Sequence, residues 1–415
     1  MNKEFLNKRY KKEKRFILLG RVAVSLTIIF LVILLGSILL RGISGFYTTN
    51  IFLTTNLSQE IIDPEDKKNV EEIYKSSWRK VARNSIYDVL SAFNKSKNID
   101  KISRKDKRDF LKLFSRSSEF YIRDFTLENL DSIGKEVKIS IPSSSLVDQF
   151  LKGKINITVN EDDRPINDKQ ISWINFMVEN KMIERKFNIN FFSKGDSRNA
   201  EEAGILGAIV GSFFVILVAV IVAFPVGVMS AIYLEEFAPK NKITNIIEVN
   251  INNLAAVPSI VFGLLGLAIF LNFFGLPRSS PLAGGLVLAL MTLPTIIISS
   301  RVAIKSVPPS IREAAMGIGA SKMQSVFHHV IPLAVPGILT GTIIGMARAL
   351  GETAPLLMMG MVAFIVDVPQ SITDPSTVLP AQIFLWSDQP ERGFEEKTAA
   401  ATIILLVFLL TMNAL

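Results

Sequence analysis

The sequence predicts an all-α polytopic membrane protein with six transmembrane helices and one extracytoplasmic α+β domain inserted between the first and second helices. Hydrophobic residues make up 49% of the 415 residues, yet 20% are charged, and the two kinds are segregated along the chain. A transmembrane helix needs about 20 consecutive apolar residues. The apolar residues gather into six long runs, whereas residues 41–200 contain no run that could cross a bilayer.

Residues 1–15 form a basic tail, and residues 16–40 form the first apolar run, interrupted only by Arg21. Positive charge beside a membrane helix usually stays in the cytoplasm, so we expect a cytoplasmic N-terminus. The run is long for a signal-peptide core and has no clear small-x-small cleavage site, which indicates an uncleaved anchor. We therefore expect a multi-pass protein of the cytoplasmic (inner) membrane. We interpret the formal net charge of +8 as a topology signal and expect no nucleic-acid partner.

Residues 41–200 mix charged and apolar residues and are long enough for one α+β domain with its own core. Helical spacing of apolar residues predicts helices within residues 66–94 and 103–117. Alternation of apolar and polar residues predicts strands around residues 137–141, 155–159 and 187–191. The acidic run Glu161-Asp162-Asp163 is more typical of a solvated turn than of a metal site. Topology places this domain outside the cytoplasm, and the sequence leaves its role open.

Residues 201–415 carry the other five predicted spans, at residues 204–231, 254–274, 282–300, 332–366 and 398–415. We expect residues 234–253 to form a short polar link. The fifth run is too long for one straight crossing at about 1.5 Å per residue. Gly351 and Pro355 therefore predict a helix, an irregular turn and a second short helix. Counting crossings from a cytoplasmic N-terminus places the loop at residues 301–332 in the cytoplasm.

The cytoplasmic loop has the pattern of two short helices joined at glycine. Ser310, followed three residues later by Glu313, predicts a capping box at the start of the first helix. The glycine-containing run Gly317-Ile318-Gly319 permits a turn. Ser321 predicts the cap of the second helix, and Pro332 is expected to end the unit. Such a unit is too short to cross a bilayer, so we expect it at the membrane surface.

This loop resembles the EAA loop of ABC importer permeases. The resemblance rests on Glu313-Ala314-Ala315, then Gly319 after three further residues, and later Ile331-Pro332. The pattern departs from the family at His329 and at Ile331, where an aliphatic residue and leucine are preferred. The resemblance extends from about Gly204 to the end of the chain. It implies coupling helices that sit in a groove of a cytoplasmic ATPase. The residues implied to couple to the ATPase are Glu313, Ala314, Ala315 and Gly319.

A second run, Ala347-Arg-Ala-Leu-Gly-Glu-Thr-Ala-Pro355, is similar to phosphate-specific permeases of the same family. Arg348 and Glu352 are ionisable residues within a membrane segment, and their i,i+4 spacing places them on one helix face. With the resemblance, Arg348, Glu352 and Thr353 become candidates for the substrate pathway. A guanidinium can offer paired donors to phosphate oxygens. The alternative is an internal ion pair that holds two helices together, and the chemistry of the residues alone does not choose between the two.

The composition excludes several kinds of site and cofactor. The absence of cysteine excludes disulfides, thiolate metal sites and a cysteine nucleophile, and with two histidines a histidine-rich metal site is not expected. No G-x-x-x-x-G-K-[ST] motif occurs, so we expect no ATP site in this chain, no cofactor and no enzymatic activity of its own. The resemblance implies that a separate pair of ATPase subunits drives transport. The other implied partners are a second homologous permease subunit, an extracytoplasmic phosphate-binding protein and phosphate itself.

Three alternatives to a phosphate permease remain. The chain could serve an importer of another oxyanion, such as molybdate or sulfate, which competition in uptake would reveal. It could be a membrane sensor whose residues 41–200 detect a ligand, although the sequence contains no cytoplasmic output domain. A stand-alone channel or secondary transporter would leave the EAA-like loop without a purpose.

Overall fold

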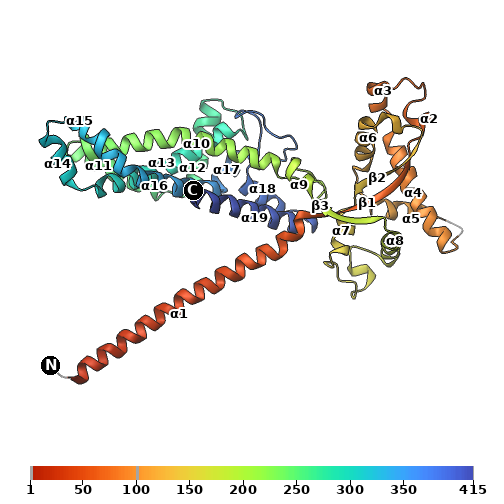
Figure 1. The fold of residues 1–415 in the computed structure, drawn as a ribbon, viewed down its shortest axis with the longest axis horizontal. Coiled ribbons are helices and arrows are strands. Elements are labelled where there is room, and N and C mark those ends of the chain that lie inside the picture. Colours follow the sequence, from red (N-terminus) through yellow and green to blue (C-terminus); the bar gives the residue numbers. More distant parts are fainter. Residues whose placement is uncertain (1–2, 100–101, 415) are drawn as a thin grey trace.

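The computed structural model describes residues 3–99 and 102–414, with side chains from residue 9 onward. The molecule is elongated (Figure 1). A helical bundle occupies one end, a small sheet covered by helices occupies the other, and the N-terminal helix α1 (Lys3–Gly42) projects away from both. We call residues 41–200 the sheet domain and residues 201–414 the bundle.

Five helices within the described residues are long and apolar enough to cross a membrane. These helices are α1, α10 (Leu206–Ile232), α13 (Pro281–Ser306), α16 (Ile331–Gly351) and α19 (Gly393–Ala414). Their positions agree with the apolar runs at residues 16–40, 204–231, 282–300 and 398–415, and with the start of the run at 332–366. The chain is therefore a mostly helical polytopic membrane protein.

The third predicted span is not one straight helix. Helix α11 (Lys242–Ala255) is followed by α12 (Ser259–Gly266) and the π-helical turn η5 (Leu267–Phe273), and the two parts meet at 99°. The expectation of a polar link at residues 234–253 was therefore wrong, because α11 occupies most of it. The bend lies at Pro258, which disfavours helical backbone at the residue before it. The bent pair is either one broken span or a re-entrant segment.

The bundle core is built where α10, α13 and α16 approach closely at small residues. A Cβ added to Gly285 of α13 would lie 2.6 Å from the Cβ of Val218 in α10. Gly263 of α12 likewise faces the backbone of Pro355, where a Cβ would approach Cα within 2.7 Å. Small residues at such contacts let membrane helices pack backbone to backbone. The glycines therefore fix how near the helices around Arg348 can lie.

The sheet domain contains, within the described residues, one antiparallel sheet in the order β2-β1-β3. The central strand β1 (Tyr47–Asn56) lies between β2 (Glu136–Pro142) and β3 (Ile183–Phe187). A buried core of side chains from β1, β2 and the longer helices holds the domain together. The helices of this domain are α2 (Gln59–Ile62), α3 (Val70–Tyr74), α4 (Trp78–Ser96), α5 (Arg104–Leu111), α6 (Ser118–Glu128), α7 (Ser145–Leu151), α8 (Asp168–Glu179) and α9 (Ile189–Ser193).

Two of the predicted strands were wrong in whole or in part. Residues 155–159 form a loop: Ile155 enters the core, whereas Ile157 and Val159 are exposed. The run at 187–191 divides between the end of β3 and the start of α9, where Asn188 caps the helix by accepting a hydrogen bond from Phe191 N–H. Alternation alone does not make a strand unless a neighbouring strand is free to pair with it.

The predicted helix at residues 66–94 is interrupted, because residues 75–77 separate α3 from α4. The helix predicted at 103–117 stops at Leu111, and Phe114 pairs with Ser143 in an isolated β-bridge instead. The central strand β1 was missed altogether. It follows the first membrane helix after one short turn, so no long polar loop in the sequence marks where the helix ends and the strand begins.

Candidate functional site

Arg348 and Glu352 lie together at the end of α16. The helix stops at Gly351, and Glu352 is its C-terminal cap with extended backbone. Arg348 Nε lies 3.7 Å from Glu352 Oε1, which is too long for a hydrogen bond. The Arg348 side chain is 62% exposed and the Glu352 side chain 22% exposed. The pair is therefore loose, and the guanidinium donors of Arg348 remain free to meet another group.

Arg348 belongs to an uncovered face of α16. Pro336, Thr340, Ile344 and Arg348 recur every four residues, and all four are exposed. Beside this face, Thr340 and Asn413 help to line a groove of about 590 Å³ between α16 and the end of α19. A charged side chain facing lipid is costly and normally faces a bundle interior, water or another chain. This face therefore requires a partner other than lipid near Arg348.

Thr353 follows directly in the irregular turn that leads to α17 (Ala354–Met358). It occupies the cap position of α17, yet its hydroxyl makes no capping hydrogen bond within the described chain. The predicted order of helix, irregular turn and short helix over residues 332–366 is thus confirmed. The turn places the backbone of Thr353 and the carboxylate of Glu352 next to the exposed arginine.

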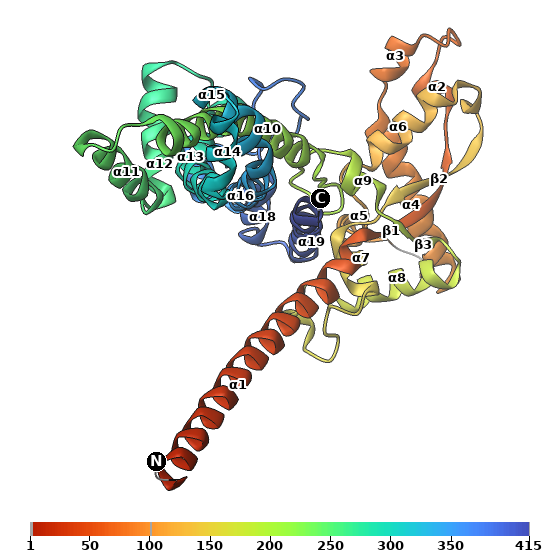
Figure 2. The same cartoon turned by 60° about the vertical axis from the view of Figure 1, so that its left-hand side comes forward.

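The EAA-like loop forms two short helices at the end of the bundle farthest from the sheet domain (Figure 1), and this end comes forward in Figure 2. These are α14 (Pro309–Gly317) and α15 (Lys322–Ser325), joined at Gly319, whose φ of +95° favours glycine. The cap predicted at Ser321 is confirmed, and the structure adds Gln324 as the partner in a capping box. The box predicted at Ser310 was wrong, because the helix already begins at Pro309 and Glu313 points outward.

Pro332 does not end the coupling unit as expected. Residues 322–351 form one continuous helical segment, in which the π-helical turn η6 (Val326–Val330) precedes α16. Pro332 occupies the first turn of α16, where a missing backbone N–H is tolerated. Helix α15 therefore continues directly into α16, the membrane helix that carries Arg348 near its other end.

The coupling loop presents an uncovered, partly apolar surface. Glu313, Ala314 and Gly319 are exposed, whereas Ala315 is buried against the loop's own core. Large apolar side chains surround them, and Ile318 is 86% exposed. Exposed apolar residues gathered in one place indicate an interaction surface.

Arg301 and Arg312, which the sequence analysis did not single out, form ion pairs beside the loop. Arg312 of α14 pairs with Glu236 at 2.6 Å and donates to the backbone carbonyls of Ile304 and Val307. The neighbouring Arg301 pairs with Glu235 and Glu248. Glu235 and Glu236 lie in the π-helical turn η4 (Tyr233–Phe237) that continues α10. These contacts connect α14 to the end of α13 and to the π-helical turn that continues α10.

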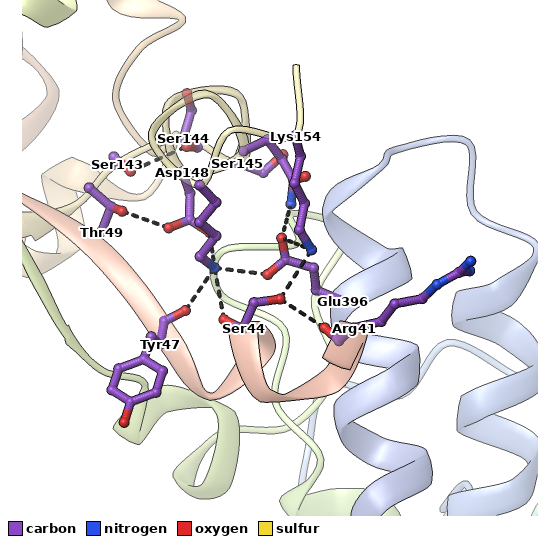
Figure 3. A network of polar contacts seen from close by, with 12 residues as sticks. Arg41, Ser44, Tyr47, Thr49, Ser143, Ser144, Ser145, Asp148, Lys154 and Glu396 are labelled. Carbon is purple, nitrogen blue, oxygen red and sulfur yellow. Dashed lines mark hydrogen bonds and ion pairs between the residues drawn. The ribbon is translucent and has the colours of Figure 1, made fainter. Parts of the chain in front are cut away.

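A second set of charges was also missed, at the junction between the sheet domain and the bundle (Figure 3). Glu396, in the first turn of α19, has a side chain only 4% exposed. It pairs with Lys152 at 2.8 Å and Lys154 at 2.6 Å, both from the sheet domain. Lys152 also pairs with Asp148 of α7 and donates to the backbone carbonyls of Ser44 and Tyr47. One buried ionic cluster therefore ties α7, the start of β1 and α19 together.

Two family models match this chain. Residues 3–161 match a domain of unknown function, DUF3333, and residues 223–415 match the binding-protein-dependent transport system inner membrane component. The first match covers α1 and most of the sheet domain. The second covers most of the bundle, including the coupling loop and the Arg348 region.

Curated relatives carry related names. The phosphate transport system permease protein PstA of Yersinia pestis is 31% identical over 59% of this chain and 81% of its own length. The probable ABC transporter permease protein YqgI of Bacillus subtilis (strain 168) is 34% identical over 41% of this chain, and the match spans 58% of YqgI. Among solved structures, a chain of an amino acid ABC transporter is 21% identical with a TM-score of 0.40, over 51% of this chain and 89% of its own. That TM-score is too low to establish a shared overall fold.

These findings agree with the resemblance carried by the EAA-like loop. The matched relatives are named as transporter permeases rather than as enzymes or sensors. The chain belongs to the family of binding-protein-dependent transport system inner membrane components, the non-catalytic multi-pass permease subunits of ABC importers.

Proposed function

We propose that this chain is one permease subunit of an ATP-driven importer of inorganic phosphate. The observation that carries the proposal is Arg348, an arginine 62% exposed on the uncovered face of a membrane helix and only loosely paired with Glu352. A relative that covers most of the bundle is named a phosphate transport permease. In this proposal the sheet domain lies outside the cytoplasm and the coupling loop inside, at opposite ends of the bundle (Figure 1).

The uncovered face of α16 is where a second homologous permease subunit would complete the pathway. Arg348 would then face a water-filled interior between two chains instead of lipid, as intramembrane charges generally do. Its guanidinium offers several N–H donors in a planar fork that suits phosphate oxygens. Thr353 adds a hydroxyl beside it. An extracytoplasmic phosphate-binding protein would deliver the anion to this face.

Glu352 would supply selectivity for phosphate. As a carboxylate it accepts hydrogen bonds but cannot donate them. The hydroxyl of protonated phosphate can donate to it, whereas sulfate at neutral pH has no such hydroxyl. In the empty state Glu352 partly neutralises Arg348, with which it makes only a 3.7 Å contact. The pair would thus hold the anion transiently, as a transport pathway requires.

Coupling would begin at the exposed surface of α14 and α15. We expect a cytoplasmic ATPase subunit to contact Glu313, Ala314 and Ile318, while Ala315 and Gly319 maintain the shape of the loop. ATP binding would close the ATPase dimer and draw the coupling helices together. The Arg312–Glu236 pair would pass this displacement to α10, and the continuous helix from residue 322 to 351 would pass it to Arg348.

The decisive experiment separates a pathway role from a structural ion pair. Uptake of labelled phosphate, sulfate and molybdate is measured for Arg348→Gln, for Glu352→Ser and for the charge swap Arg348→Glu with Glu352→Arg. Arg278→Gln is the matched control, because Arg278 is an exposed arginine of the bundle outside α16. Membrane levels and copurification with the ATPase are measured for each variant.

The proposal predicts that Arg348→Gln lowers phosphate uptake about tenfold or more, the usual scale for a lost charge-assisted hydrogen bond. Glu352→Ser should narrow the difference between phosphate and sulfate. The charge swap should stay inactive, because it restores a pair but not the order of charges along the pathway. Recovery of uptake by the swap would assign the pair a structural role. Normal phosphate uptake in Arg348→Gln would exclude a role of Arg348 in the pathway, whereas uptake of another anion in place of phosphate would favour an importer of a different oxyanion.

A further inference from the structure

A cavity of about 690 Å³ lies between the sheet domain and the bundle, away from Arg348. The sheet domain contributes the loop between α5 and α6 and the start of α7 to its lining. The rest of the lining comes from residues 198–201, which lead into α10, and from residues 390–392, which lead into α19. Cavities of roughly 300–1,000 Å³ are the usual size for small-molecule ligands. Anything bound here contacts the sheet domain and the entrances of two membrane helices at once.

The lining of this cavity carries an excess of unpaired positive charge. Arg116, Arg198 and Arg392 line it, and none of them forms an ion pair with any residue that the structure describes. Arg198 lies over the Phe364 ring at 5.4 Å, which leaves its N–H donors free. Lys112 also lines the cavity, but Asp109 neutralises it at 2.9 Å. Three arginines without ion pairs thus line the cavity from three separate segments.

The polar side chains that line the cavity beside these arginines include two serines and two glutamates. Ser144 also lines the cavity, and its Oγ is buried without a hydrogen-bond partner among the described residues. Glu391 accepts a hydrogen bond from Ser145 Oγ, so that carboxylate is already partly occupied. Glu201 is the other acid in the lining.

We propose that this cavity is a binding site for a phosphate-class anion, either inorganic phosphate or a small phosphorylated molecule. Guanidinium groups recognise such anions through paired, charge-assisted hydrogen bonds. The apolar side chains of Phe114, Leu146 and Ile155 on the same wall leave room for an organic part beside the anionic group. The site does not depend on the cargo proposed for the Arg348 region, so either assignment can fail alone.

Glu201 gives the site a dependence on pH. Burial, with a contribution from the nearby Glu391 carboxylate, raises the pKa of Glu201 to about 7. Glu202 adds negative charge and Ser115 donates a hydrogen bond to the same region. Lys397 of α19 and the three arginines supply the positive charges that face it. Protonated Glu201 can donate to an anion, whereas ionised Glu201 repels it, so binding should weaken as the pH rises through about 7.

The test is equilibrium dialysis of the purified full-length chain against labelled inorganic phosphate, pyrophosphate and glycerol phosphate at neutral pH. The first variant is Arg116→Gln with Arg392→Gln. Arg83→Gln is the matched control, because Arg83 is an exposed arginine of α4 outside the cavity. Arg348→Gln separates this site from the membrane pathway. All the substituted cavity arginines are exposed, so the variants should fold normally.

We expect saturable binding that the double substitution weakens by about tenfold for each arginine lost. Arg83→Gln should leave that binding unchanged, and the double substitution should weaken it to the same degree in an Arg348→Gln background. Tighter binding of phosphate identifies the inorganic anion as the ligand, and tighter binding of glycerol phosphate identifies a phosphorylated metabolite class. The proposal is overturned if none of the three anions binds saturably, or if binding survives the double substitution and is lost in Arg348→Gln.

Discussion

Replacing Glu396 with glutamine should loosen the junction between the sheet domain and the bundle. The substitution keeps the size of the side chain and removes its charge. Glu396 is 4% exposed and contacts Lys152 Nζ at 2.8 Å, Lys154 Nζ at 2.6 Å and Gln149 Nε2 at 2.7 Å. Its loss leaves Lys152, which is 5% exposed, with one fewer compensating charge.

The cost follows from which contacts remain. Removing one partner of a buried ion pair typically costs about 3–5 kcal/mol. Lys152 keeps Asp148 and the carbonyls of Ser44 and Tyr47, and Lys154 is 35% exposed and can reach water. We therefore expect the lower end of the range, about 3 kcal/mol. At 1.4 kcal/mol for each factor of ten, local opening should become roughly 100-fold more frequent.

Hydrogen exchange of the purified chain measures that opening directly. Amides of α7 and of the first turns of α19 should exchange roughly 100-fold faster, in line with the opening free energy. Amides in the core of α13 should be unchanged. Glu395→Gln is the matched control, because Glu395 is an exposed neighbour that forms no ion pair with any described residue. Equal exchange in the two variants would refute the claim that Glu396 holds the sheet domain to the bundle.

Three further predictions test other parts of the account. Arg312→Gln leaves Glu236, which is 8% exposed, without its partner. The loss should destabilise the coupling loop by about 3 kcal/mol and reduce copurification with the ATPase. Normal copurification and uptake would contradict transmission through the Arg312–Glu236 pair. In Glu201→Gln, anion binding should lose the part of its pH dependence that comes from Glu201, because the wild-type carboxyl holds its proton only below its raised pKa of about 7. The part that comes from ionisation of the phosphate ligand should remain. A pH profile identical to wild type would rule out this role of Glu201. Gly285→Leu should lower the amount of this protein in the membrane severalfold, because even a Cβ would lie 2.6 Å from Val218 Cβ. Immunoblotting of membranes measures that amount. A normal amount would mean that α10 and α13 can separate to make room for the leucine.

Elements that depend on local composition could be predicted from the sequence. The helices at residues 16–40, 282–300 and 398–415 follow from runs of apolar residues long enough to span a bilayer. The turn at Gly319 and the capping box at Ser321 depend on residues next to one another. The break after Gly351 was also predictable, because the apolar run there exceeds one crossing.

Features that depend on distant partners could not be predicted. Glu396 and Lys152 are 244 residues apart, and nothing local marks them as a pair. Pro332 was expected to end a helix, but the π-helical turn before it lets the helix continue. Pro258, in contrast, produces a sharp bend where a straight span was expected. The same residue type thus has opposite effects according to the backbone around it.

The long distance between Arg348 and Glu352 could also not be predicted from the sequence. Their spacing shows that the two side chains can meet, but not that the helix ends between them. The 3.7 Å separation and the exposure of the arginine favour a site that awaits a ligand over a closed structural pair. The free arginines of the junction cavity were equally hidden, because they come from segments far apart in the sequence.

Uptake of labelled phosphate at low external concentration, in cells with and without this chain, tests the central claim most directly. Sulfate and molybdate are measured in parallel, in cells that lack other phosphate transporters. The account predicts that removal of the chain abolishes phosphate uptake alone, and that Arg348→Gln reproduces the loss at normal membrane levels. Phosphate uptake that persists without the chain, or loss of a different anion, would contradict the proposed cargo.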